Sequence, residues 1–225
     1  MPVTFAKTTA FANSQSLNWS GYAVPASSAS ATVASGSWIQ PSVTCSGGAS
    51  YASFWVGIDG FNSNSVEQSG TLGQCSGGAA RYSAWYEFYP AASVTISSIT
   101  VHPGDSFSST ISYSSSTGQF SLTITDVTTG KSFTTTGTAS GAQRSSAECI
   151  AERPSIGGSI TKLAKFGTVN FSQCNATING VSGPFGSFSG VQSIDMVSRS
   201  GKLLAQTSAL GSDQASFTVT WKASN

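Results

Sequence analysis

Strand-like segments separated by turn residues recur along the whole sequence, and no window shows a convincing helical period. The clearest strands are predicted over residues 52–59, 81–89 and 120–127, and Thr128-Thr129-Gly130 joins the last of these to residues 131–136 as a hairpin. Further strands are predicted over residues 31–39, 93–101, 106–113, 145–152, 164–171, 191–198 and 214–221. The chain is therefore expected to be all-β, a jelly-roll-like antiparallel β-sandwich of two curved sheets with a substrate cleft on a concave face.

The length of 225 residues suits a single all-β domain with a sizeable core. Serine and threonine are abundant, but 39% hydrophobic and 11% aromatic residues favour a packed core over disorder. No domain-sized linker or repeat interrupts the pattern. We expect an N-terminal extension over residues 1–17 and one β-sandwich domain over residues 18–225.

The low charge of the chain excludes some partners. Charged residues make up 8% of the sequence, the net charge is +1, and no basic run is present, so nucleic acid is not expected as a partner. No stretch approaches the ~20 apolar residues of a transmembrane helix, so no membrane partner is expected either. No residue pattern argues for a dimer, and we expect a monomer.

A surface that hydrogen-bonds water through hydroxyl groups has few ionised acids to protonate, so acidification should cost the fold little stability. We therefore hypothesise that this surface is adapted to acid. A generic hydroxyl-rich secreted protein has the same composition, and that alternative stays open. The segment from Met1 to Asn13 lacks the charged start and apolar run of a secretory signal. If the protein is secreted, as we expect, Met1 marks a start placed after a removed leader.

Four widely spaced cysteines without paired histidines argue for disulfides and against a zinc site. We favour the pairs Cys45–Cys75 and Cys149–Cys174, because each closes a moderate loop around turn-rich sequence. Neither a metal nor another cofactor is expected.

The chain has only nine carboxylates and one histidine, so acid–base chemistry must draw on few residues. Asp105, Asp126 and Asp213 lie next to turn signals and are interpreted as structural, while Asp195 and Glu67 have no independent signal. His102 lies in a turn, and no serine has the context of a nucleophile elbow. A nucleophilic triad is therefore disfavoured.

Strand alternation places aromatic rings beside the remaining carboxylates. Trp55 shares a strand face with Asp59, and Trp85 shares one with Glu87 and Tyr89. Flat rings and hydrogen-bonding acids are what a cleft for a peptide or a sugar needs. The alternative interpretation is that the tryptophans pack between layers.

Glu148 and Glu152 are four residues apart, so their carboxyls share one face of a strand or of a helix. This pair completes a set of motifs that occur in one order: N-W-S-G-Y at 18–22, W-V-G-I-D-G at 55–60, V-E-Q-S-G at 66–70, A-W-Y-E-F-Y-P at 84–90, A-E-C-I-A-E-R-P at 147–154 and G-T-V-N-F at 167–171. In their order and spacing, over most of the chain, they resemble the glutamic peptidases, or eqolisins.

The resemblance implies a sandwich of two long curved sheets and an endopeptidase that uses a glutamine and a glutamate at acid pH. The catalytic glutamine of the family falls on Gln68 and its catalytic glutamate on Glu152. The positions that match cleft-lining residues are Trp19, Trp55, Asp59 and Glu87. Glu148 is kept as a cleft neighbour, since a shift of one strand repeat would exchange it with Glu152. Cys149 departs from the family, which commonly has an aromatic residue there.

Peptide hydrolysis needs a base for water, a donor to the oxyanion and an acid for the leaving amine. Glu152 is expected to supply both proton transfers and Gln68 the oxyanion donor. The expected partners are polypeptide substrates. Two alternatives stay open: a jelly-roll glycoside hydrolase that uses Glu87 and Glu152, and a non-catalytic sandwich that binds carbohydrate or peptide.

Overall fold

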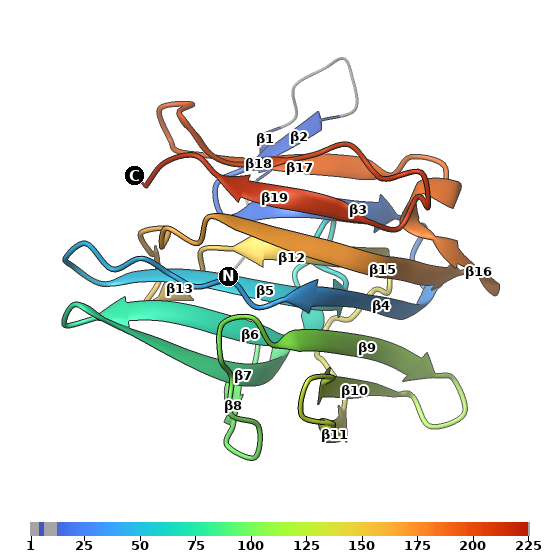
Figure 1. Cartoon of the computed structure of the whole chain (residues 1–225). Helices are drawn as coiled ribbons and strands as arrows, with labels where there is room; N and C mark the ends of the chain where they lie inside the picture. Colours follow the sequence, from blue (N-terminus) through green and yellow to red (C-terminus); the bar gives the residue numbers. More distant parts are fainter. Residues whose placement is uncertain (1–4, 7–12, 225) are drawn as a thin grey trace.

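The computed structural model describes residues 5–6 and 13–224, and the regular secondary structure of this part is almost entirely β-strand (Figure 1). Its one helical element is the 3₁₀ turn η1 (Phe185–Ser187). Strands pair antiparallel throughout, except that β2 (Asn13–Ser16) runs parallel to β17 (Gln192–Val197). The two-residue strand β1 (Phe5–Ala6) pairs with β2.

The first layer, called the cleft sheet here, carries the candidate site. Its strands, in spatial order from β17, are β3 (Trp19–Pro25), β12 (Ser146–Glu152), β5 (Ser50–Ile58), β6 (Val66–Ser76), β7 (Ala79–Tyr89) and β8 (Val94–Ile96). A separate two-stranded hairpin, β13 (Ser155–Ile156) and β14 (Ser159–Ile160), follows β12.

The second layer, called the outer sheet here, packs behind the cleft sheet. Its strands, in spatial order, are β11 (Lys131–Gly137), β10 (Gln119–Asp126), β9 (Ser106–Ser114), β4 (Ala31–Ile39), β15 (Thr168–Ile178) and β19 (Phe217–Trp221), and β16 (Val181–Pro184) forms a hairpin with β15. Contacts of β4 and β9 with β5, and of β9 and β10 with β6, stack the two layers.

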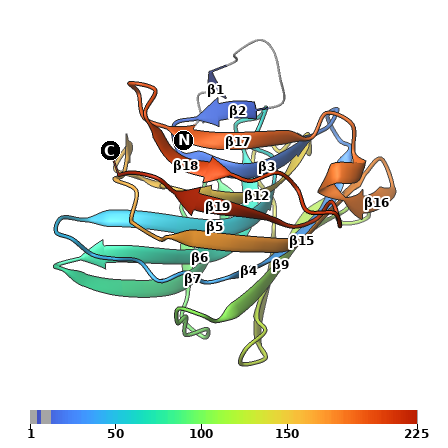
Figure 2. The same ribbon diagram turned by 45° about the horizontal axis from the view of Figure 1, so that its top comes forward.

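The predicted all-β sandwich is confirmed, with one difference in how its layers relate. β18 (Leu203–Thr207) pairs with β19 on one side and with β17 on the other, so the cleft sheet and the outer sheet are continuous along one side. The sandwich is thus a single sheet folded back on itself, with its curvature visible in Figure 2.

The core between the layers is rich in aromatic rings. Phe54, Val56 and Ile58 point into it, as strand alternation predicts. The indole of Trp38 stacks on Phe107 at 5.9 Å between ring centroids, and its Nε1 donates to Thr71 Oγ1 at 2.8 Å. A buried indole needs such a partner, because an unpaired N–H would cost free energy.

One of the two predicted disulfides is present. Cys45 and Cys75 are bonded, while Cys149 and Cys174 are free thiols buried in the core, so the second predicted pairing is wrong. Both free sulfurs lie against Gly36, where a Cβ would approach Cys149 Sγ to 2.6 Å and Cys174 Sγ to 3.3 Å. These thiols therefore act as small apolar side chains that fill space in the core. In the described part of the chain, no helix is long and apolar enough to cross a membrane.

Candidate active site

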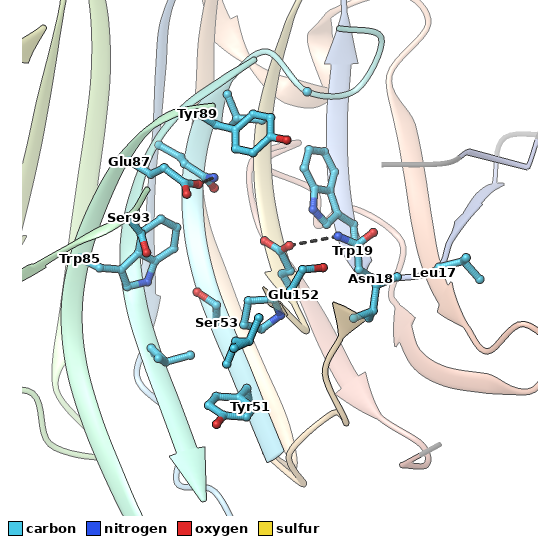
Figure 3. Close-up of a pocket in the computed structure, with 18 of the residues that line it drawn as sticks. Leu17, Asn18, Trp19, Tyr51, Ser53, Trp85, Glu87, Tyr89, Ser93 and Glu152 are labelled. Atoms are coloured by element: carbon cyan, nitrogen blue, oxygen red, sulfur yellow. Dashed lines mark hydrogen bonds between the residues drawn. The ribbon is translucent and has the colours of Figure 1, made fainter. Parts of the chain in front are cut away.

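A cleft of about 600 Å³ opens on the cleft sheet. Its lining includes Asn18, Trp19, Gln68, Trp85, Glu87, Tyr89, Glu152 and the β13–β14 hairpin. Figure 3 shows Glu87 and Glu152 pointing into this cleft from different strands, with Trp85 and Tyr89 near Glu87, and Trp19 near Glu152. Aromatic area and a few converging polar groups are typical of a ligand site.

Strand register places the polar residues in two rows on one face. In the first row, Glu148, Gly57, Gln68 and Glu87 are opposite one another across β12, β5, β6 and β7. The second row begins with Glu152, which pairs with Ser53. Directly opposite residues in antiparallel strands point to the same side, so the register brings Gln68, Glu87 and Glu152 to one face.

Side-chain nitrogen donors hold both carboxyl oxygens of Glu152. Trp55 Nε1 donates to Oε2 at 2.8 Å and Asn18 Nδ2 donates to Oε1 at 3.0 Å. The indole of Trp19 also contributes a hydrogen bond that favours the charged carboxyl. Such donors suit a carboxylate, because an ionised carboxyl only accepts hydrogen bonds.

Burial nevertheless dominates the proton affinity of this group. It raises the pKa of Glu152 to about 7, the negative charge of Glu87 adds to the rise, and the hydrogen bonds from Trp55, Asn18 and Trp19 oppose it. A group that must first take a proton and later return it works best when neither form is strongly favoured. Glu152 has this balance close to pH 7, and its protonated form predominates in acid.

Gln68 and Glu87 are joined by a short hydrogen bond. Gln68 Nε2 donates to Glu87 Oε2 at 2.6 Å, while Gln68 Oε1 is buried without a partner. Burial raises the pKa of Glu87, and the bond from Gln68 opposes that rise. The bond fixes the Gln68 side-chain amide, and leaves its second N–H available to a ligand in the cleft.

The indole of Trp55 connects the two rows. Its Nε1 reaches Glu152, and its six-membered ring lies over Gly57, where a Cβ would come within 2.9 Å of Trp55 Cζ3. Trp19 packs edge-to-face on Trp55 with 4.8 Å between centroids. Trp55 itself is fully buried and absent from the cleft lining, so it positions Glu152 rather than presenting a ring to a ligand.

Asp59 differs from the expectation of a cleft-lining acid, because it is fully buried. It accepts the backbone N–H groups of Gln143, Arg144 and Ser145 at 2.7–2.9 Å, and also the hydroxyl of Ser145 at 3.0 Å. Its φ of 73° takes it out of the extended geometry of β5. The carboxylate thus anchors the loop that leads into β12.

Glu148 also differs from the expectation, since it has no exposed surface and does not line the cleft. Both of its carboxyl oxygens are buried, and the nearby Ser146 hydroxyl favours their charged form. Burial raises its pKa well above the usual value, and the charges of Asp59 and Glu67 act in the same direction. Glu148 is therefore a neutral interior group, and Glu152 is the member of the pair that reaches the cleft.

Sequence reasoning named Gln68, Glu87, Glu152 and Trp19, which the structure brings together, but assigned no role to Asn18. Asn18 precedes β3, where strand alternation gives no signal, and only the bend between β2 and β3 turns its amide toward Glu152. Among the residues that the structure describes, no group of three or more His, Cys, Asp or Glu side chains is arranged to hold a metal ion.

Two curated relatives are fungal. Aspergillopepsin-2 of Aspergillus niger is 37% identical over 175 residues, which cover 76% of this chain and 59% of the relative. Scytalidopepsin B of Scytalidium lignicola is 35% identical over 152 residues, which cover 62% of this chain and 56% of the relative. The alignments thus span less than two thirds of the length of either relative.

Solved structures agree with these relatives. A crystal structure of scytalido-glutamic peptidase with a transition state analog inhibitor has a TM-score of 0.78 at 25% identity, over 91% of this chain and 98% of that one. Aspergilloglutamic peptidase from Aspergillus niger has a TM-score of 0.67 at 34% identity, over 77% of this chain and 99% of that one. These findings confirm the resemblance to glutamic peptidases. Because the Peptidase A4 family description matches residues 17–221, nearly the whole described sandwich, the chain belongs to the peptidase A4 family.

Proposed function

We propose that the chain is an endopeptidase that hydrolyses polypeptides at acid pH, with Glu152 and Gln68 as its catalytic residues. The observation that carries the proposal is the meeting of a partly exposed, donor-held carboxyl and a fixed side-chain amide in one aromatic-lined cleft. Membership of the peptidase A4 family supports it. The Cys45–Cys75 disulfide supports an extracellular site of action, because such bonds persist in oxidising compartments.

Glu152 in its ionised form takes a proton from a water molecule, which attacks the scissile carbonyl. The protonated form then delivers that proton to the departing amine. Its raised pKa favours this second step, and the donors Trp55 and Asn18 keep the ionised form accessible for the first.

Gln68 donates its free N–H to the oxyanion that develops on the carbonyl oxygen. An amide does not titrate in the working range, so this donor stays intact in acid, where a histidine would be protonated. Glu87 holds the other N–H and so keeps the amide plane oriented.

The test is incubation with a denatured protein and with a panel of polysaccharides at acid and neutral pH, followed by product analysis. We expect peptides alone. Glu152→Gln should abolish cleavage, and Gln68→Ala should lose roughly 10²–10³ in kcat, the usual loss for one oxyanion donor.

Glu148→Gln is the matched control for the first variant, because it makes the same change four residues away in the interior. It should retain cleavage when folded, as judged by circular dichroism. Full activity of Glu152→Gln, or release of sugars with no peptides, would contradict the proposal. Release of sugars would point instead to a glycosidase that uses the two cleft carboxyls, Glu87 and Glu152.

A further inference from the structure

Arg199 gives one wall of the cleft a positive charge. It lies in the exposed turn between β17 and β18, where Gly201 N–H donates to Ser198 C=O at 3.0 Å. Met196 pairs with Ser16, so the end of β17 runs beside the segment that leads into Asn18. Of the described residues that line the cleft, Arg199 is the sole lysine or arginine.

A second arginine lies behind this wall. Arg153 is 3% exposed, its Nε donates to Leu17 C=O at 2.7 Å, and its Nη1 is buried without a partner. Burial lowers the pKa of Arg153, and the positive charge of Arg199 lowers it further. In the described part of the chain the one ion pair is His102–Asp105, and neither arginine is neutralised by a carboxylate.

The other titratable groups near this wall do not compensate its charge. On β17, Asp195 accepts the N–H of Thr207 at 2.8 Å and interacts with Lys222. In the cleft, burial raises the pKa values of Glu87 and Glu152 and so disfavours their charged forms. An uncompensated pair of positive charges at a cleft wall attracts an anion.

We propose that Arg199 selects polypeptide substrates that present a carboxylate to the Leu17–Asn18 wall of the cleft. The inference rests on the proposed peptidase function and names the substrates that this function favours. A guanidinium matches a carboxylate with two parallel hydrogen bonds, and the turn leaves Arg199 free to make them. Arg153 adds its charge from behind without touching the ligand, because its Nη1 is enclosed. The carboxylate can come from an acidic side chain or from the free C-terminus of a peptide.

The experiment uses single-site peptides in matched pairs. In one arm, Glu is compared with Gln at each position around the scissile bond, and in the other a free C-terminus is compared with its amide. kcat/KM is measured at pH 3 and pH 5.5 for wild type, Arg199→Gln and Arg199→Lys. Lys131→Gln, an exposed change on β11 in the outer sheet, is the matched control.

Wild type should prefer the carboxylate at one position, or at the C-terminus, by about fivefold at pH 5.5, which is the upper end for a partly exposed ion pair. For a glutamate side chain the preference should fall toward unity at pH 3, since its pKa is about 4.3. Arg199→Gln should abolish the preference, Arg199→Lys should keep part of it, and Lys131→Gln should keep all of it.

The inference is overturned if wild type shows no preference in either arm, or if Arg199→Gln keeps it. If no peptide is cleaved at all, the proposed function has failed rather than the role of Arg199. That role is then tested by titrating the same pairs calorimetrically against Glu152→Gln, with and without Arg199→Gln. The carboxylate member should bind about fivefold tighter only when Arg199 is present, and equal binding would overturn the inference.

Discussion

Glu87 acts on both proposed catalytic residues at once. Its carboxyl holds the Gln68 amide at 2.6 Å, and its negative charge raises the pKa of Glu152. The first effect fixes the direction of the oxyanion donor, and the second sets the pH range in which the base is ionised. The sequence indicated Glu87 as a cleft-lining residue, or as a catalytic carboxylate of a glycoside hydrolase, and the geometry of its bond to Gln68 suits a positioning role.

We predict that Glu87→Gln separates these effects. The amide can still accept from Gln68, but a hydrogen bond without charge is weaker by about 1 kcal/mol, so kcat should fall about fivefold. Removing the charge lowers the pKa of Glu152, so the acid limb of the kcat/KM profile should move to lower pH. Glu87→Ala, which removes the acceptor, should show a larger fall in kcat. An unmoved acid limb in Glu87→Gln would contradict the electrostatic role.

Alternation along a strand predicted the side to which Trp55 and Glu152 point, but it fails where the strand ends. Trp55 and Glu152 lie on the faces that a period of two assigns to them. Asp59 was placed on the cleft face by the same count, but it follows the last residue of β5, and its φ of 73° turns it toward backbone donors instead. The alternation of side chains along a strand does not predict the backbone conformation of residues that follow the strand.

At the scale of elements, β6 shows what sequence patterns miss. It carries Gln68 and lies in the centre of the cleft sheet, yet no strand was predicted over residues 66–76 because the segment is rich in glycine and small polar residues. The structure gives the reason: a Cβ at Gly70 would come within 2.6 Å of Trp55 Cβ. Gly70 thus lets β6 lie close against the β5 chain at Phe54 and Trp55, and propensity scales count glycine against a strand.

The strands with clear alternation were predicted close to their observed bounds, as for β5, β7, β10 and β12. The segment predicted at 164–171 lies instead at Thr168–Ile178 in β15. Its pairing with β4 is shifted between Ser172 and Asn175, and such an irregularity interrupts the period that a sequence count relies on. The domain boundary near residue 18 stays a prediction.

Asp59 links two elements, and we predict that Asp59→Asn destabilises the fold by about 2–3 kcal/mol. All of its measured partners are donors, comprising three backbone N–H groups and the hydroxyls of Ser63, Ser65 and Ser145. An asparagine must turn an NH₂ group toward some of these donors, which leaves buried N–H groups unpaired. The measurement is denaturant unfolding at constant pH.

Asp213→Asn is the control, because this aspartate also accepts from local backbone but at an exposed turn, where water replaces a lost partner. It should change stability by less than about 0.5 kcal/mol. Equal stability of Asp59→Asn and wild type would show that the loop before β12 does not depend on a carboxylate.

Most acids in the described part of the molecule are buried or half-buried, while the outer sheet carries rows of hydroxyl groups. On the outer sheet, Thr123 and Thr125 hydrogen-bond across the strands to Thr134 and Ser132 at 2.9 and 3.0 Å. These contacts do not depend on pH. Interior acids do depend on it, so the pH response of stability is set by Glu67 and Glu148 rather than by surface ion pairs.

Stability should therefore fall from acid to neutral pH. Glu67 pairs with Ile58 on the core face of β6, and neither of its carboxyl oxygens has a partner. Burial, with the charge of Asp59 adding to it, raises its pKa to about 9 from a model-compound value of 4.5. The folded state holds the proton of Glu67 more tightly than the unfolded state does. Protonated Glu67 therefore contributes its full stabilisation of the fold below about pH 4.5, and this contribution is lost progressively as the pH rises toward 9.

Between pH 4.5 and pH 7, Glu67 alone should cost roughly 3 kcal/mol of unfolding free energy, at about 1.4 kcal/mol per pH unit, and Glu148 acts in the same direction. Against a typical total of about 5–15 kcal/mol, this loss is a large fraction of the unfolding free energy. Urea unfolding of wild type at pH 4, 5.5 and 7 measures how the unfolding free energy changes with pH. Glu67→Gln cannot ionise, so its slope should be flatter even if its stability at pH 4 is lower. Two outcomes would contradict this prediction: an equal dependence of unfolding free energy on pH in Glu67→Gln and wild type, or a wild type equally stable at pH 4 and 7. Either outcome would point to the hydroxyl-rich surface as the source of acid adaptation.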